Sequence, residues 1–331
     1  MAKPITLSRA CESMIRYKTA IGKSVHTISD YKNTFKKLLL FFEDDPPFPS
    51  VTRDQLVAFF AWLQDDYISE PDGVAPRGKV RLSPKSILNI HVNLSALWTW
   101  GVNEGFIDKN IIRAIEPPPV SEPVIVPFTK DEVAALLKAC DQSRTWKTRA
   151  TTATDRPTAV RDRAIILTLL DTGCRASELC GMCFGDLNMS TNSIKVRGKG
   201  RGREPKERIV YVGKRAAQAI WRYLLPRLDT IRDDDPLFAN DPKDSSQPIT
   251  RTTLTKLVSR IGERADVADT YPHRFRHTFA INYLRNDGDL FTLQALLGHT
   301  DLAMVKRYAR IAQMDCADTH RRASPVDNWK L

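Results

Sequence analysis

The chain has 331 residues, enough for two ordinary domains that each bury a core without metal or disulfide staples. Its six cysteines are scattered, and it shows no signal-like N-terminus and no apolar run long enough to cross a bilayer. We therefore expect a cytoplasmic protein without membrane partners. Lys and Arg outnumber Asp and Glu by 50 to 39, and most of the excess follows Glu116. Such a basic field attracts polyanions, nucleic acid above all.

Residues 1–116 show the apolar periodicity of helices. Apolar side chains recur at steps of three and four in three stripes, at residues 31–42, 56–63 and 87–98. A further helix is expected around residues 6–22, and Ser83 before Pro84 is typical of a helix start. The pattern predicts a mainly α fold that begins with a bundle of about four helices.

Five prolines interrupt the pattern within residues 117–128, which predicts a linker because proline lacks an amide donor and restricts its own backbone angle. Thr129 follows, with Glu132 three residues later. This spacing predicts a capping box at the start of a new helix. We therefore expect a second domain over residues 129–331.

The second domain is predicted to be mostly helical, with one small antiparallel β-sheet. The stretch "RDRAIILTLLDTGCRASELCGM" indicates a buried helix, a Gly-containing break and a second helix that starts near Arg175. Alternating "SIKVR" and "RIVYV" flank a Gly-rich turn, which is typical of a β-hairpin with a basic tip. Helical spacing returns at residues 216–224 and 250–265. Two stretches are expected to be loops, residues 69–81 and 141–158.

From residue 171 onward, six segments follow one another: "DTGCRASEL", "VRGKG", "KERIVYV", "HRFRHTFA", "LLGHT" and "VKRYA". Single pieces such as GKG recur by chance, whereas the ordered set is specific. In order and approximate spacing, the chain resembles the tyrosine recombinases, the family of phage integrases and Xer-type recombinases. The resemblance implies a SAM-like core-binding domain over residues 1–116 and a catalytic domain over residues 129–331.

The resemblance also implies that a side-chain hydroxyl attacks a DNA phosphodiester, which requires charge stabilisation at the phosphate oxygens. Arg175 and Arg276 match the family's two motif arginines and are expected to clamp the scissile phosphate, because guanidinium groups make paired hydrogen bonds to phosphate. Either one alone would be interpreted as a solvated arginine. Glu178, one helical turn after Arg175, is expected to orient it; a plain surface carboxylate is the alternative.

Three histidines surround this set. His273 and Arg276 share a face if a helix begins at Pro272. Imidazole titrates near neutral pH, so His273 could accept the nucleophile's proton or donate a hydrogen bond. By resemblance, His299 in "LGHT" hydrogen-bonds the phosphate. His277 is interpreted as a structural histidine.

Lys199, at the hairpin tip, resembles the family's general acid for the 5′-hydroxyl. The segment "GKGRGREPKER" is longer than the compact family version, so Lys206 is a competing candidate for that role. The basic residues of the hairpin are expected to contact the DNA backbone. These DNA-binding candidates are Arg197, Arg201, Arg203 and Lys206.

Tyr308 matches the family's nucleophile. Phenol is a weak nucleophile at neutral pH unless cations favour its anion, and Lys306, Arg307 and the clamp arginines supply them. Attack would leave a 3′-phosphotyrosyl bond close in energy to the bond broken, so we expect no cofactor and no metal. Cys180 and Cys183 form a C-x-x-C without a second ligand pair at zinc-like spacing, and we expect them to be buried thiols.

The sequence therefore predicts a site-specific recombinase that cuts and rejoins double-stranded DNA in integration, excision, transposition or dimer resolution. By resemblance, it would act as a homotetramer on DNA, with residues 313–331 as the segment that each subunit passes to its neighbour. Two alternatives stay open. A type IB topoisomerase uses a similar residue set but swivels strands as a monomer, and a catalytically silent DNA-binding protein would keep the same fold.

Overall fold

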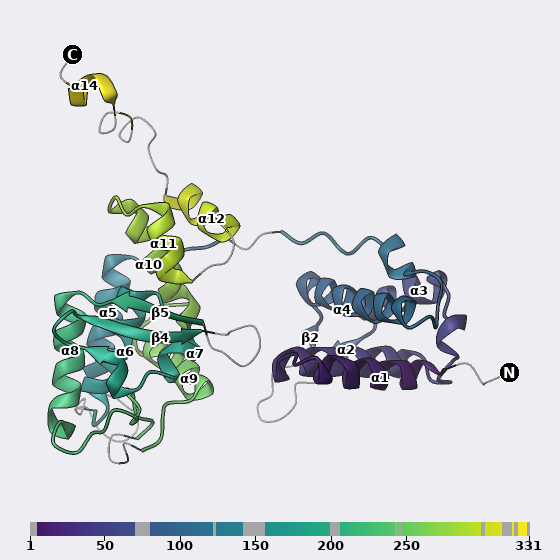
Figure 1. Cartoon of the computed structure of the whole chain (residues 1–331), viewed down its shortest axis with the longest axis horizontal. Coiled ribbons are helices and arrows are strands. Elements are labelled where there is room, and N and C mark those ends of the chain that lie inside the picture. The colour runs from purple at the N-terminus through teal and green to yellow at the C-terminus, as the bar shows by residue number, and fades with distance from the viewer. Residues whose placement is uncertain are drawn as a thin grey trace. The chain divides into compact units, whose positions relative to one another are not determined.

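The computed structural model describes residues 5–69, 80–121, 124–141, 156–198, 206–241, 244, 246–298, 302–312, 320 and 324–329. The chain divides into two compact units, Met1–Pro123 and Val124–Leu331, and the division falls inside the Pro-rich segment 117–128. Helices dominate both units, which confirms the mainly α fold class (Figure 1). Among the described residues, no helix is both long and apolar enough to cross a membrane.

The first unit contains four long helices, as predicted. They are α1 (Leu7–Ala20), α2 (Val25–Phe41), α3 (Arg53–Asp65) and α4 (Pro84–Asn103), with short 3-10 turns η1 (Phe48–Ser50) and η2 (Ile111–Ala114). The predicted start of α4 is confirmed, because the Ser83 hydroxyl accepts from the Ser86 amide at 3.2 Å. Strands β1 (Ile68–Ser69) and β2 (Val80–Arg81) pair antiparallel, so the ends of the segment expected to be a loop form a short ladder.

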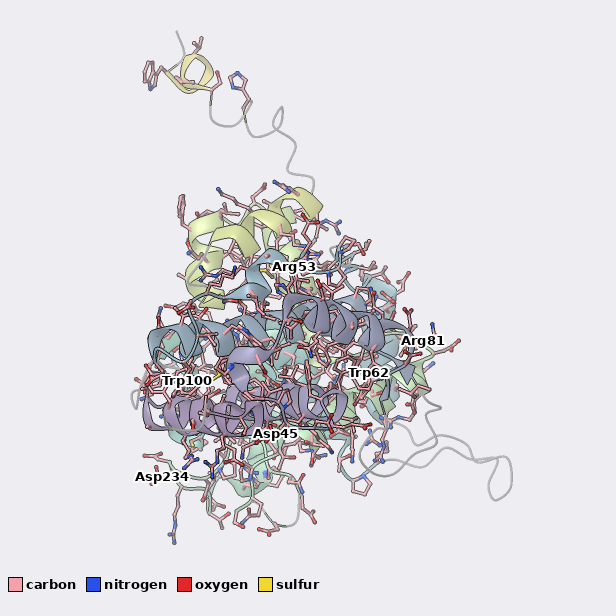
Figure 2. The ribbon with its side chains drawn as sticks, turned by 90° about the vertical axis from the view of Figure 1, so that its right-hand side faces the viewer. Asp45, Arg53, Trp62, Arg81, Trp100 and Asp234 are labelled. Carbon is pink, nitrogen blue, oxygen red and sulfur yellow. The ribbon has the colours of Figure 1, made fainter. Side chains whose placement is uncertain are left out.

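Aromatic packing stabilises the first unit. Trp62, which is labelled in Figure 2, belongs to this aromatic cluster. Its ring centroid lies 5.6 Å from that of Phe41 and 6.0 Å from that of Phe59. The loop after α2 is tied back to α1, since the Asp45 carboxylate accepts from the amide and hydroxyl of Ser8 at 2.8 and 2.6 Å. The apolar stripes predicted from the sequence form the core of this unit.

The second unit is built from helices around one small sheet (Figure 1). Its elements are α5 (Lys130–Asp141), α6 (Ala159–Thr172), α7 (Ala176–Cys180), η3 (Phe184–Asp186), α8 (Lys214–Leu224), η4 (Leu225–Arg227), α9 (Arg251–Ala265), α10 (Pro272–Arg285), α11 (Leu290–Leu297), α12 (Leu302–Ala312) and α14 (Pro325–Trp329). The predicted capping box is confirmed: Thr129 and Glu132 exchange hydrogen bonds of 2.7 and 3.1 Å at the start of α5.

The predicted hairpin is confirmed and belongs to a three-stranded antiparallel sheet. Its strands are β3 (Leu187–Asn188), β4 (Ser193–Gly198) and β5 (Lys206–Tyr211), in the order β3-β4-β5. The short strand β3 was not predicted, because a strand of two residues is too short to show an alternating pattern of apolar and polar side chains. Gly198 pairs with Lys206 at the last position of the β4–β5 ladder, and the predicted basic tip between them lies outside the described residues.

The last residues of the predicted linker pack on the second unit. The Phe128 amide donates to the Thr278 hydroxyl at 2.8 Å, and the guanidinium of Arg274 lies 4.0 Å from the centre of the Phe128 ring. Arg274 also donates to the backbone carbonyl of Val126 at 3.1 Å. These contacts attach residues 126–128 to α10.

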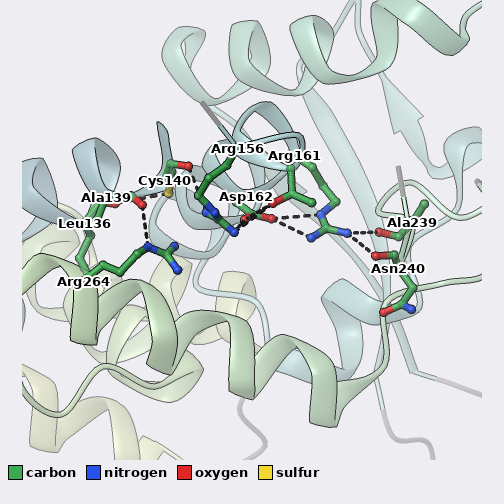
Figure 3. A network of polar contacts seen from close by, with 10 residues as sticks. Leu136, Ala139, Cys140, Arg156, Arg161, Asp162, Ala239, Asn240 and Arg264 are labelled. Atoms are coloured by element: carbon green, nitrogen blue, oxygen red, sulfur yellow. Dashed lines mark hydrogen bonds and ion pairs between the residues drawn. The ribbon is translucent and has the colours of Figure 1, made fainter. Parts of the chain in front are cut away.

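A buried ion network fixes the start of α6 (Figure 3). Asp162 is fully buried and accepts from Arg156 at 2.7 Å and from Arg161 at 2.9 Å. Arg161 in turn donates to the backbone carbonyls of Ala239 and Asn240. The charge of Asp162 is compensated on both sides, which a buried carboxylate requires. The same helix delivers its C-terminus to the site described next.

Candidate active site

The site begins where α6 ends. Gly173 follows the helix with a φ of 58°, in the left-handed region that favours glycine. A Cβ at this position would also lie 2.4 Å from the ring of Phe279, so space as well as conformation demands glycine. The turn leads directly to Arg175, the N-cap of α7, whose amide donates to the Glu178 carboxylate at 2.7 Å.

Two arginines share the carboxylate of Glu178, which is only 1% exposed. Arg208 of β5 donates to both of its oxygens, at 2.7 and 2.8 Å, and Arg175 donates to Oε1 at 2.9 Å. Burial raises the pKa of Glu178, but the hydrogen bonds and charges of Arg208 and Arg175 prevail and hold that pKa below its ordinary value. The carboxylate stays ionised, and the cluster keeps a net positive charge.

The carboxyl end of α11 gathers arginines from three elements. Arg208 donates through Nε to the Leu296 carbonyl at 2.7 Å. Arg276 of α10 donates to the Leu297 carbonyl at 2.8 Å, and Arg175 lies 3.4 Å from the same oxygen. Carbonyls in the last turn of a helix lack intrahelical partners and carry partial negative charge, so they attract cations. The helix end thereby holds three guanidinium groups in one place.

Arg276 is the most deeply buried of the three, with 1% of its side chain exposed. Its second bond goes to the carbonyl of Gly173 at 2.8 Å, which ties α10 to the turn after α6. Burial and the neighbouring charge of Arg175 lower the pKa of Arg276 to about 10. The guanidinium therefore stays charged at neutral pH, as a phosphate ligand must.

Tyr308 lies on α12 and is fully buried against α10. Its hydroxyl is 2.9 Å from Nδ1 of His277. Burial raises the pKa of the phenol, whereas the charges of Arg276, Arg307 and Arg175 oppose that rise. The predicted nucleophile thus lies within the electrostatic influence of both predicted clamp arginines.

His273 occupies the first turn of α10, which begins at Pro272 as predicted. Its exposed ring packs edge-on against the ring of His277, with centroids 4.5 Å apart. Desolvation by the neighbouring side chains, together with the charges of Arg276 and Arg175, lowers the pKa of His273. The ring is therefore neutral at pH 7, and it can donate or accept a hydrogen bond.

Other predicted site residues lie around or beyond this cluster. Lys206 is exposed at the first position of β5. Arg197 donates to both oxygens of Asp186 at 2.6 and 2.7 Å and lies 3.4 Å from Glu207, so its charge is balanced within the protein. Four predicted residues lie outside the described part of the chain: Lys199, Arg201, Arg203 and His299.

Sequence reasoning missed two residues of the site. Arg208 was not selected, because nothing local indicates that the partner of its guanidinium lies 30 residues earlier. His277 was interpreted as a structural histidine, yet it contacts the predicted nucleophile. Its position four residues after His273, on the same helical face, was the available signal.

The described cysteines are free thiols. Cys180 and Cys183 were predicted to be buried, and they are only half-buried, because α7 ends at Cys180 and the chain turns at Gly181. Within the described ranges, no group of three or more His, Cys, Asp or Glu side chains is arranged to hold a metal ion.

Comparison with known proteins agrees with this geometry. The sequence pattern of the phage integrase family matches residues 127–314, which is more than half of the chain and includes the whole arginine cluster and Tyr308. The chain belongs to the phage integrase family. This membership confirms the resemblance predicted from the ordered motifs.

Relatives of this phage integrase family member are named recombinases. Tyrosine recombinase XerC of Thermodesulfovibrio yellowstonii is 29% identical over 313 residues, covering 92% of each chain. The Tn1549 transposon integrase in complex with a circular intermediate DNA is 20% identical, with a TM-score of 0.72 over 96% of this chain and 99% of that one. A lambda integrase tetramer bound to a Holliday junction is 16% identical, with a TM-score of 0.66 over 93% and 78%. The enzyme is a tyrosine-type site-specific recombinase.

Proposed function

We propose that this recombinase cuts and rejoins double-stranded DNA through a covalent bond between Tyr308 and a 3′-phosphate. The observation that carries the proposal is the convergence at the end of α11, where Arg175 and Arg276 are held beside each other. Both charges also act on the Tyr308 phenol. Arg175 is thus brought together with Arg276 and Tyr308, which lie more than 100 residues later in the chain.

The arginine cluster supplies charge stabilisation to the reaction. Glu178 accepts a hydrogen bond from Arg175. Arg208 donates to both oxygens of Glu178 and so compensates most of the negative charge of that buried carboxylate. Arg175 therefore keeps a side chain that is 39% exposed, with a positive charge that a phosphate can meet. Preorganised cations of this kind stabilise the charge that develops on phosphorus-bound oxygens without reorganising during the reaction.

The rest of the chemistry follows from the same residues and their neighbours. Tyr308 attacks the phosphorus, and the P–O5′ bond breaks. Lys199 protonates the departing 5′-oxygen, with Lys206 as the competing donor. His299 and His273 hydrogen-bond the phosphate. Since one phosphodiester replaces another, a second 5′-hydroxyl can reverse the step without ATP, a metal ion or another cofactor.

We assign DNA binding to both units. Residues 1–116 would form the core-binding domain, 117–128 the linker and 129–331 the catalytic domain. The solved relatives include integrases on DNA and a tetramer on a Holliday junction. By analogy, four copies of this chain would assemble on DNA, with residues 313–331 passed between subunits.

Capture of the covalent complex tests the proposal. The protein is mixed with DNA from the flanks of its own gene, denatured in detergent and separated by size, and the attached strand is sequenced. Wild type should carry a DNA strand by its 3′-end, and Tyr308→Phe should carry none. Tyr283→Phe is the matched control and should form the adduct. An adduct in Tyr308→Phe, or none in wild type on a site that the protein binds, would contradict the proposal.

Plasmid relaxation and a gel-shift assay, run beside the covalent capture, separate the two alternatives. A type IB topoisomerase would relax a supercoiled plasmid that lacks the flanking site, whereas a recombinase should cleave only DNA that carries it. A catalytically silent protein would shift the DNA in a gel and give no adduct.

A further inference from the structure

The contact between His277 and Tyr308 places an imidazole nitrogen against the hydroxyl of the proposed nucleophile. Nδ1 of the imidazole and the phenolic oxygen are 2.9 Å apart, within the range for a hydrogen bond. The Tyr308 ring is fully buried and the His277 ring is half-buried. α12 packs along α10, so helix packing sets the pair rather than a chance surface encounter.

A proton must leave this phenol when it attacks phosphorus. Burial raises the pKa of Tyr308 above its ordinary value even with Arg276, Arg307 and Arg175 nearby, so the hydroxyl is protonated at neutral pH. A general base has to stand within hydrogen-bond reach of the proton that it takes. His277 meets that condition in the tautomer that carries its own proton on Nε2, because Nδ1 is then an acceptor.

His273 was the base expected from the sequence, and the geometry favours its neighbour. The two rings lie one helical turn apart and touch edge-on. Desolvation and the charges of Arg276 and Arg175 lower the pKa of His273, which makes it a weaker base. His273 is also exposed to solvent, whereas His277 is half-buried. The two histidines therefore have different roles in the scheme: His273 hydrogen-bonds the phosphate, and His277 accepts the proton of Tyr308.

We propose that His277 is the general base that takes the phenolic proton of Tyr308 during cleavage and returns it during rejoining. In cleavage, the O–H bond of Tyr308 breaks and its proton moves to Nδ1 of His277. The phenolic oxygen then bonds to phosphorus, the P–O5′ bond breaks, and the 5′-oxygen takes its proton from the general-acid lysine. Rejoining runs the same transfers backwards. This inference rests on the function proposed above.

Single-turnover cleavage of duplexes by three proteins tests the assignment: wild type, His277→Ala and His277→Asn. Asparagine places an amide oxygen close to the position of Nδ1, so it keeps a hydrogen-bond acceptor that cannot take up a proton. Both variants should cleave about 10²–10⁴-fold more slowly than wild type, the usual contribution of a positioned base. Near wild-type cleavage by His277→Asn would overturn the proposal, because a hydrogen bond alone would then suffice. Faster cleavage by His277→Ala would also overturn it, since the imidazole would then restrain Tyr308.

A second substrate separates nucleophile activation from the rest of the reaction. Sulfur in place of the bridging 5′-oxygen makes a leaving group that needs no proton. On this DNA, whichever of Lys199→Ala and Lys206→Ala removes the general acid should recover, whereas both His277 variants should stay slow. Recovery of the His277 variants would overturn the assignment. Added imidazole should restore cleavage by His277→Ala, with a rate that rises with the pKa of the imidazole used.

Folding and function have separate controls. The His277 variants should melt near the wild-type temperature and keep wild-type affinity for the duplex, because DNA binding is spread over many phosphate contacts. If wild type forms no adduct at all, the proposed function fails and this inference fails with it. If wild type forms the adduct and the His277 variants form it equally fast, only the inference fails.

Discussion

The two units of the chain bury different kinds of side chain. In the described part of the first unit, Thr34 is the one buried polar side chain, and the core is otherwise aliphatic, aromatic and sulfur-containing. The described part of the second unit buries seven charged side chains: Arg161, Asp162, Glu178, Asp186, Arg227, Arg274 and Arg276. Among the residues that the structure describes, fully buried charged side chains occur only in the second unit.

Two of these seven residues, Glu178 and Arg276, belong to the candidate active site. Removing a charge from water is unfavourable, and an ion pair of good geometry does little more than offset this penalty. An apolar core would be a simpler way to stabilise the second unit. Under the proposed function, the buried guanidinium of Arg276 is kept because a phosphate needs cations whose positions do not change when it arrives.

The largest expected effect is on catalysis. Arg276→Ala and Arg175→Ala should each lower single-turnover cleavage by about 10³-fold or more, the range seen when a charge-stabilising arginine is removed from phosphoryl transfer. Affinity for DNA should change little, because many other phosphate contacts remain. Arg285→Ala, an exposed arginine at the end of α10, is the matched control and should cleave normally. Near wild-type cleavage by either clamp variant would refute the role of that arginine.

Arg208→Ala should destabilise the second unit by about 3–5 kcal/mol, because it removes the chelating partner of a buried carboxylate. Hydrogen exchange on the whole chain measures this, since it reports the amides of each unit separately. Exchange should accelerate in the second unit and stay unchanged in the first. Arg215→Ala, exposed on α8, should leave both units as they are. Arg208→Lys should cause an intermediate loss of stability, because lysine keeps the positive charge but cannot make the paired hydrogen bonds of a guanidinium group.

An apolar truncation in the first unit should give the opposite pattern. Leu94→Ala removes a fully buried side chain from α4 and should cost about 2–5 kcal/mol in the stability of the first unit. Protection of amides from hydrogen exchange should fall in the first unit and stay unchanged in the second. Val92→Ala, at an exposed position of the same helix, is the control. A loss of protection in both units from Leu94→Ala would show that the two cores unfold together.

The smallest expected effect is a difference between the two units in how their stability depends on pH. The pKa of Glu178 is lower in the folded chain than in an unfolded one, so its contribution to stability is complete above the unfolded value, about 4.3, and is lost as pH falls through the folded value. The second unit should therefore lose protection in that acid range. The first unit has a half-buried carboxylate with a lowered pKa in Asp45, and it should lose less. Equal losses of protection in both units would show that the lowered pKa of Glu178 does not set the acid sensitivity of the second unit.

Local patterns allowed much of the fold to be predicted. Ser83 and Thr129 cap their helices through neighbours three residues away, and the β4–β5 hairpin follows from alternation around a Gly-rich turn. Each depends on interactions within one or two turns of chain, which a sequence displays directly. Arg175, Arg276 and Tyr308 became candidates through the order of their motifs; the match to the phage integrase family confirms the family, and the roles of these residues stay predictions.

The sequence by itself determined the helical class, the helix starts, the hairpin and the family. Only the tertiary structure decided which groups touch. Arg208 meets Glu178 across 30 residues, and His277 meets Tyr308 across 31. The physical reason is that these contacts depend on how α7, β5, α10, α11 and α12 pack, and packing is a property of several segments together. A hydrogen bond between distant residues leaves no periodicity in either of them, so no single stretch of sequence could reveal it.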